Sequence, residues 1–213
     1  MVSGQKPWAV VVPVKRLAYA KTRLDLPPAD RARLALAMAE DTIRACVTSE
    51  AVRQVVVVTD DADGAAMAAA LGATVVADEP DDGLNPALRH GATRAPADLR
   101  IATVSSDLPS LRADDLGAAL EAALPYACAI VADAAGTGTV LYAAAGLADF
   151  RPAYGERSRT AHVRAGAVDL TDGATARLRR DVDTLADLAD AWNLGTGPAT
   201  RRAAGSIGIL PIG

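Results

Sequence analysis

The sequence predicts an α/β fold with a mixed, mostly parallel sheet flanked by helices. Short apolar runs recur along the chain, and most are continuous rather than alternating between apolar and polar residues. Continuous runs are typical of strands that are buried on both faces. Alanine- and leucine-rich segments of helical length lie between the runs. Alternation of strands and helices is the pattern of this fold class.

The expected strands follow the apolar runs, at residues 8–14, 54–59, 73–77, 100–104, 127–132 and 138–144. The expected helices lie at about 28–48, 62–71, 85–95, 112–124 and 184–194. Pro27 and Pro28 mark the start of the long helix, and Asp183 and Thr184 offer side-chain oxygens to the free N–H groups of the last one. The glycine-rich stretch 136–183 departs from this rhythm, so we expect an irregular lobe over the carboxyl edge of the sheet.

Composition limits the number of domains and the kinds of partner. A chain of 213 residues with 51% hydrophobic and 23% charged residues can bury one large core. No linker or repeat divides it, so we expect a single domain over 1–213. A net charge of -4 argues against a nucleic-acid binder, which needs a basic surface. The apolar runs are too short for a membrane span, and the first 17 residues lack a secretory-signal pattern, so we expect a cytoplasmic protein.

A basic loop follows the first expected strand. It holds four cations, Lys15, Arg16, Lys21 and Arg23, within a few residues of one another. A cationic loop at the end of a strand suits a triphosphate. Lys21 and the next residue imitate the end of a P-loop, but no glycine precedes them in the loop, so the backbone cradle for phosphate is missing. A solvated basic loop is the alternative interpretation.

Three aspartates indicate a metal site. Asp107 follows the strand at 100–104, at the end where open α/β sheets bind ligands. Asp181 and Asp183 project on the same side of an extended segment, where their charges repel unless a cation lies between them. Mg²⁺ takes oxygen ligands and bridges phosphates, so it is the predicted cofactor. Helix caps at Asp107 and Asp183 are the alternative.

Glycines in the stretches 136–139 and 154–159 occur beside threonine, serine and arginine. Freed backbone N–H groups, hydroxyls and guanidinium groups together form an anion-binding nest, although ordinary turns would have the same composition. His90 and His162 have no second histidine or cysteine at ligand spacing. We therefore expect them to have surface or hydrogen-bonding roles.

Six segments in this order resemble the guanylyltransferases of deazaflavin coenzyme F(420) biosynthesis, the 2-phospho-L-lactate or phosphoenolpyruvate guanylyltransferase family. They are VPVKRLAYAKTRL at 12–24, DEPDDGLNPAL at 78–88, SSDLPSL at 105–111, GTGTVLYA at 136–143, YGERSRTAH at 154–162 and RRDVDTLADL at 179–188. The resemblance covers nearly the whole chain. It implies one nucleotidyltransferase domain of the glycosyltransferase-A type, related to the Rossmann arrangement.

The resemblance also implies a reaction and its site residues. The reaction transfers GMP from GTP to phosphoenolpyruvate, giving enolpyruvyl-diphospho-5′-guanosine and pyrophosphate; a downstream deazaflavin transferase is the implied pathway partner. The residues with implied roles are Lys15, Arg23 and Asp107 in catalysis, Lys15, Lys21, Arg23 and Asn85 at GTP, Asp107, Asp181 and Asp183 at the metal, and Thr139, Gly155 and Ser158 at the phosphate and carboxylate of phosphoenolpyruvate. The chain departs from the family pattern at Tyr154 and at residues 156–157, between the acceptor positions.

Several alternatives stay open on the sequence. 2-Phospho-L-lactate and 3-phospho-D-glycerate also carry a phosphate and a carboxylate, so either is an alternative acceptor. A sugar-phosphate or molybdopterin nucleotidyltransferase is disfavoured because the loop after the first strand lacks glycine. A catalytically silent nucleotide-binding protein would share the binding residues. A nicotinamide-dependent oxidoreductase is disfavoured because the chain has no G-x-G-x-x-G motif.

Overall fold

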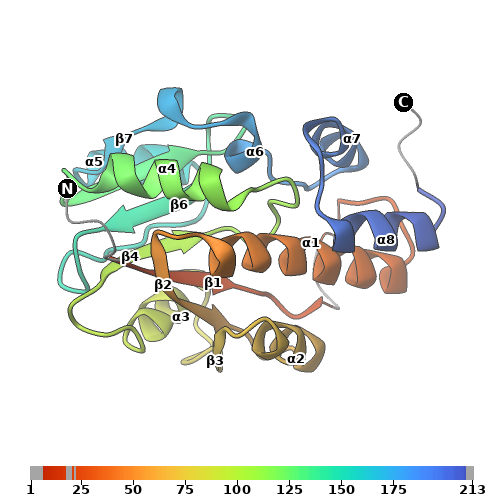
Figure 1. Ribbon diagram of the computed structural model, residues 1–213, viewed down its shortest axis with the longest axis horizontal. Coiled ribbons are helices and arrows are strands. Elements are labelled where there is room, and N and C mark those ends of the chain that lie inside the picture. Colours follow the sequence, from red (N-terminus) through yellow and green to blue (C-terminus); the bar gives the residue numbers. More distant parts are fainter. Residues whose placement is uncertain (1–6, 18–20, 22, 210–213) are drawn as a thin grey trace.

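The computed structural model of the protein describes residues 7–17, 21 and 23–209. The described strands form one seven-stranded sheet in the order β3-β2-β1-β4-β6-β5-β7 (Figure 1). Their bounds are β1 Trp8–Pro13, β2 Val52–Val58, β3 Thr74–Val76, β4 Arg100–Val104, β5 Cys128–Ala132, β6 Thr139–Ala144 and β7 Val168–Asp169. β1 pairs in parallel with β2 and β4, whereas β6 is antiparallel to both β4 and β5. The mixed, mostly parallel sheet is therefore confirmed.

The five expected helices are present, and the structure adds three. The bounds are α1 Pro28–Thr48, α2 Ala62–Ala70, α3 Leu84–Ala92, α4 Ala113–Ala123, α5 Ser158–Arg164, α6 Ala176–Arg179, α7 Leu185–Leu194 and α8 Pro198–Ser206. A short 3-10 helix spans Thr171–Gly173. α1 has the predicted bounds, with a proline in its first turn. Thr184 caps α7: its hydroxyl accepts the N–H of Asp187 (3.2 Å), whose carboxylate accepts the N–H of Thr184 in return (2.9 Å).

Both faces of the sheet are covered, which explains the continuous apolar runs. In β1, Val10 and Val12 belong to a core shared with α1, α2 and α4, whereas Val11 belongs to a second core shared with α3. α3 lies so close to the sheet that a Cβ on Gly91 would come within 2.5 Å of Val58. Glycine at this position therefore permits the close packing of helix on strand.

A third cluster joins α1 to the end of the chain. Leu34 and Met38 of α1 pack against Leu188 of α7 and Ala199 of α8, and α8 lies along α1 in Figure 1. The buried carboxylate of Asp41 accepts the N–H groups at the start of α8 (3.0 and 2.8 Å). A carboxylate at this end of a helix satisfies its free N–H groups.

The segment 136–183 is more regular than expected. The expected strand at 138–144 is β6, and the segment also supplies β7 to the sheet and contributes α5 and α6. The irregular parts are the connections between these elements, including residues 151–157 before α5. Within the described residues, no helix combines the length and apolar character that crossing a membrane requires.

Candidate active site

The predicted site residues gather at one edge of the sheet. Because β1 and β4 are parallel, Lys15 after β1 and Asp107 after β4 leave the sheet at the same edge. β6 runs in the opposite direction, so its first residue, Thr139, lies at that edge too. The N–H of Ser105 donates to the carbonyl of Val140 (2.9 Å), which places the segment after β4 beside the start of β6. Three segments singled out separately in the sequence thus meet in space.

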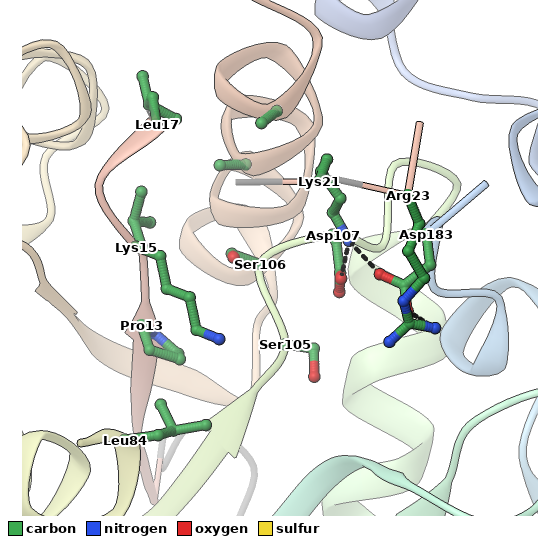
Figure 2. Close-up of a pocket in the computed structure, with 13 residues that line it drawn as sticks. Pro13, Lys15, Leu17, Lys21, Arg23, Leu84, Ser105, Ser106, Asp107 and Asp183 are labelled. Carbon is green, nitrogen blue, oxygen red and sulfur yellow. Dashed lines mark hydrogen bonds and ion pairs between the residues drawn. The ribbon is translucent and has the colours of Figure 1, made fainter. Parts of the chain in front are cut away.

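A cavity of about 330 Å³ opens between the ends of β1 and β4, a size typical of small-ligand sites. Its polar lining consists of Lys15, Lys21, Arg23, Ser105, Ser106, Asp107 and Asp183. Figure 2 shows Lys15 on one wall, with Lys21, Arg23 and the two aspartates on the other. Arg16 turns to a different partner, the carboxylate of Asp60 at 3.1 Å. Residues 18–20 and 22 of the basic loop lie outside the described residues.

Lys21 joins two aspartates from distant parts of the chain. Its ammonium forms hydrogen-bonded ion pairs with Asp107 and, at 2.9 Å, with Oδ1 of Asp183; the other oxygen of Asp183 lies 3.3 Å from Arg23. Burial alone would lower the pKa of Lys21, but the charges and hydrogen bonds of both aspartates outweigh it and raise the pKa. We call Lys21, Arg23, Asp107 and Asp183 the ion-pair cluster. It holds two cations and two anions.

Asp181 lies next to this cluster. The N–H of Val182 donates to the carbonyl of Asp107 (3.1 Å), so the segment 181–183 runs beside the end of β4. Burial, together with the charges of Asp107, Asp133 and Asp183, raises the pKa of Asp181 to about 7. A carboxyl group in this position takes up a proton unless a cation offsets the surrounding negative charge.

The aspartates have the oxygen ligands that a divalent metal ion prefers, but their side chains are not arranged around a common point. Oδ1 of Asp107 is buried and has no hydrogen-bond partner, which is costly for a carboxylate oxygen. In the part of the chain that the structure describes, however, no three carboxylate, histidine or cysteine side chains are close enough together to hold a metal ion. The Lys21 ammonium bridges Asp107 and Asp183 instead.

A second group of polar residues lies at the start of β6, and its side chains are uncharged. His162 of α5 is 1% exposed. Its Nδ1 lies 3.1 Å from the hydroxyl of Thr139, and its Nε2 accepts the N–H of Ala153 (2.9 Å). The ring of Tyr154 packs edge-on against the imidazole at 5.2 Å, and the Tyr154 hydroxyl hydrogen-bonds to Thr103. We call Thr103, Thr139, Tyr154 and His162 the histidine cluster.

Asn85 connects the cavity to this cluster. Its amide nitrogen donates to the carbonyl of Tyr154 (2.9 Å), and its amide oxygen accepts the N–H of the same residue (2.7 Å). The preceding residue, Leu84, lines the cavity. The amide that we expected at GTP is thus engaged with the segment before α5, although it lies beside the cavity.

The remaining predicted acceptor residues flank the start of α5. Gly155 has a φ of 143°, a conformation that residues with a side chain rarely adopt, and no heavy atom lies within 4 Å of its Cβ position. Ser158, at 3% exposure, is the first residue of α5, one helical turn before His162. The acceptor roles of Thr139, Gly155 and Ser158 stay predictions. Of the two roles expected for His162, the hydrogen-bonding one is confirmed, but its partners Thr139 and Ala153 were not predicted. The four-residue spacing of Ser158 and His162 on one helix was the available signal.

The family model described as "Guanylyl transferase CofC like" matches residues 8–205, almost the whole chain. The chain belongs to this family. The family suggested by the six sequence segments is therefore confirmed. Membership places the chain among guanylyl transferases, which are nucleotidyltransferase enzymes.

Relatives within the CofC-like family are close in sequence. The phosphoenolpyruvate guanylyltransferase of Geodermatophilus obscurus is 52% identical over 202 residues, covering 92% of this chain and 93% of the relative. The phosphoenolpyruvate guanylyltransferase of Thermomonospora curvata is 51% identical over 197 residues, covering 91% and 86%. Among solved structures, a nucleotide-diphospho-sugar transferase from Desulfovibrio desulfuricans G20 superposes with a TM-score of 0.64 at 20% identity, covering 95% of this chain and 97% of that one. The nucleotidyltransferase fold is thus shared well beyond the family.

Proposed function

We propose that this CofC-like protein transfers GMP from GTP to phosphoenolpyruvate, releasing pyrophosphate. A phosphate oxygen of the acceptor forms a bond to the α-phosphorus of GTP, and the bond from that phosphorus to the β-phosphate oxygen breaks. The acceptor phosphate is dianionic at neutral pH, because its second pKa is near 6, so the attack needs no strong base. The product is enolpyruvyl-diphospho-5′-guanosine, a precursor in coenzyme F(420) biosynthesis.

The observation that carries this proposal is a cavity that holds cations and aspartates together at the end of β4. Transfer between two anions requires that their charges be offset and that they be held in line. Lys15, Lys21 and Arg23 supply three positive charges to the cavity walls. The high identity to proteins named phosphoenolpyruvate guanylyltransferase supports GTP and phosphoenolpyruvate as the substrates.

We propose Mg²⁺ as the cofactor, held by Asp107, Asp181 and Asp183. The unpartnered buried oxygen of Asp107 and the raised pKa of Asp181 both indicate that this set of carboxylates needs a cation. A bound divalent ion would offset the charge on the phosphates of both substrates. Holding the ion would require Asp107 and Asp183 to release Lys21, whose ammonium would then be available to the phosphates of GTP.

The other predicted residues divide between the two substrates. Lys15, Lys21 and Arg23 bind the triphosphate and the departing pyrophosphate, and Lys15 and Arg23 with Asp107 form the catalytic set. Thr139, Gly155 and Ser158 bind the phosphate and carboxylate of the acceptor.

We propose that the protein acts in the cytoplasm, where GTP and phosphoenolpyruvate are both present. The downstream deazaflavin transferase would consume the product.

A coupled turnover assay tests the proposal. Purified protein is mixed with GTP, Mg²⁺ and one of three acceptors: phosphoenolpyruvate, 2-phospho-L-lactate or 3-phospho-D-glycerate. Pyrophosphate release is followed, and the product is trapped by the downstream transferase with its deazaflavin. We expect turnover with phosphoenolpyruvate. Turnover with a different acceptor alone would reassign the acceptor residues, and GTP binding without turnover on any acceptor would indicate a silent nucleotide-binding protein.

A further inference from the structure

His162 is enclosed on every side by groups that fix its orientation. Its imidazole is stacked on the ring of Tyr142, with centroids 4.7 Å apart, and Tyr154 packs against its edge. At 1% exposure it has almost no contact with solvent. Both ring nitrogens nevertheless have polar partners, so the side chain does more than fill the core.

The hydrogen bond at Nε2 determines where the imidazole carries its proton. The partner is the backbone N–H of Ala153, at 2.9 Å, and a backbone N–H can only donate. Nε2 must therefore be unprotonated, and the proton of the neutral ring is on Nδ1. Burial also lowers the pKa of His162 to about 4, against a smaller opposing effect of its hydrogen bond to the backbone of Ser158. The ring is accordingly neutral at physiological pH.

This tautomer sets the direction of the hydrogen bond to Thr139. Nδ1 carries the only proton of the neutral ring, so it donates, both toward the backbone of Ser158 and toward the Thr139 hydroxyl 3.1 Å away, and that hydroxyl cannot donate to it. The hydroxyl keeps its own proton for a second partner. Across residues 7–17, 21 and 23–209, no other group forms a hydrogen bond with this hydroxyl. The hydroxyl proton of Thr139, a residue that is 6% exposed, is thus left without an acceptor among the described residues, beside the segment that leads to Asp107.

We propose that His162 is a positioning residue that turns the Thr139 hydroxyl into an obligatory hydrogen-bond donor for the anionic acceptor substrate. The same ring fixes the backbone at Ala153, two residues before Gly155, so one side chain orients two parts of the acceptor site. This inference rests on the proposed function, which places phosphoenolpyruvate at Thr139, Gly155 and Ser158. It adds that the site presents a fixed donor, which matches a phosphate or carboxylate oxygen.

The tautomer can be observed without any substrate. The chain has two histidines, His90 and His162, so a ¹⁵N-histidine-labelled sample gives two imidazole spin systems, and the His90→Gln variant assigns them. We expect a proton on Nδ1 and none on Nε2 of His162 between about pH 6 and 8. A proton on Nε2, or a doubly protonated ring, would overturn the inference whether or not the protein turns over phosphoenolpyruvate.

Steady-state kinetics separates positioning from simple core packing. In the His162→Gln variant the amide oxygen can replace Nε2, but nothing donates to Thr139; in His162→Asn the amide nitrogen can replace the Nδ1 donor. We expect the Gln variant to raise the KM for phosphoenolpyruvate about tenfold while the KM for GTP stays within about twofold, and the Asn variant to recover part of the loss. Equal changes in the two KM values would contradict the proposal.

Substitutions at Thr139 keep the test decisive if a buried histidine variant fails to fold. Thr139→Ser retains the hydroxyl, whereas Thr139→Val removes it at similar volume. We expect the KM for phosphoenolpyruvate to rise much more in the Val variant than in the Ser variant. Adding His162→Gln to Thr139→Val should then raise that KM little further, because the two residues act through one hydroxyl. Equal values for Ser and Val, or fully additive losses, would overturn the proposal.

The tautomer and the turnover assay together show whether the role of His162 or the proposed function is wrong. With the Nδ1 tautomer present and no turnover on any of the three acceptors, the proposed function is wrong and the acceptor role of Thr139 is rejected with it. With turnover on phosphoenolpyruvate but the other tautomer, the proposed function stands and the role of His162 is wrong.

Discussion

The ion-pair cluster and the histidine cluster lie at the same edge of the sheet but are stabilised by opposite kinds of interaction. The first consists of full charges on loops, and Arg23 in it is largely exposed. The second consists of neutral groups with directional hydrogen bonds, and its central ring is 1% exposed. Charges on loops can exchange partners when a metal or triphosphate arrives, whereas a buried hydrogen-bond network keeps one geometry. We infer that the first cluster adapts to its ligands and the second is preformed.

The largest effect is expected from removing a charge in the ion-pair cluster. Asp107→Asn keeps the shape of the side chain but removes a proposed metal ligand. We expect turnover to fall by at least about a hundredfold, the size seen when one electrostatic catalytic group is lost, with the unfolding temperature nearly unchanged. Asp114→Asn, which removes the same charge from an exposed position on α4, is the control. Near-normal Mg²⁺-dependent turnover in the Asp107 variant would remove this residue from the site.

The next effect concerns stability and comes from the histidine cluster. The pKa of His162 is about 4 in the folded state, below the ordinary value of 6.5. Between these values the unfolded chain binds a proton that the folded protein does not, so stability falls as the pH is lowered through this window. We expect His162 to account for on the order of 2–3 kcal/mol of lost stability between about pH 7 and pH 4.5.

Urea unfolding at the two pH values measures this loss. The parent should lose more stability than the His162→Gln variant, since every other titrating group is common to both proteins. Identical losses in the parent and in His162→Gln would mean that the imidazole is not held neutral, and the contrast between the two clusters would fail.

A variant of Asn85 tests whether the cavity and the histidine cluster depend on each other. Asn85→Ala leaves the N–H and carbonyl of Tyr154 without their partners, so we expect a loss of about 2 kcal/mol of stability and a higher KM for phosphoenolpyruvate. Asn193→Ala, at an exposed position on α7, is the control. A rise confined to the KM for GTP would instead show that Asn85 binds the nucleotide, as the family resemblance implies.

The smallest effect tests whether the ion-pair cluster exchanges partners. In Lys21→Met no ammonium competes for Asp107 and Asp183, so Mg²⁺ should bind more tightly in the absence of nucleotide, by on the order of tenfold. Calorimetric titration measures this affinity. Arg53→Met, which breaks an exposed ion pair with Asp98, should leave it unchanged. Weaker Mg²⁺ binding in the Lys21 variant would show that the lysine assists the metal.

The sequence predicted the strands and long helices well because their signals are local. α1 was predicted with its bounds because two prolines precede an apolar periodic segment. α8 was missed because PATRRAAGS has a weak apolar pattern, and its packing depends on α1, more than a hundred residues earlier. The insertion of β6 between β4 and β5 likewise depends on long-range pairing.

For the site, the sequence indicated which residue types matter but not their partners. Asp107, Asp181 and Asp183 were identified as a set, yet nothing local indicates that Lys21 bridges two of them. The amide of Asn85 meets the backbone of Tyr154 across 69 positions. His162 has no second histidine or cysteine at the spacing of metal ligands. The tautomer on which its proposed role depends is determined by neighbours that only the fold brings together.

The separation of tasks between the cavity that contains the ion-pair cluster and the histidine cluster can be tested most directly with two variants. Lys15→Ala changes the wall of that cavity, and Thr139→Val changes the histidine cluster. Both KM values are measured for each variant in the coupled assay with Mg²⁺. We expect Lys15→Ala to raise the KM for GTP about tenfold and hardly to change the KM for phosphoenolpyruvate, and Thr139→Val to do the reverse. If both variants raise both KM values equally, the two regions do not bind different substrates, which contradicts the proposed division of the site.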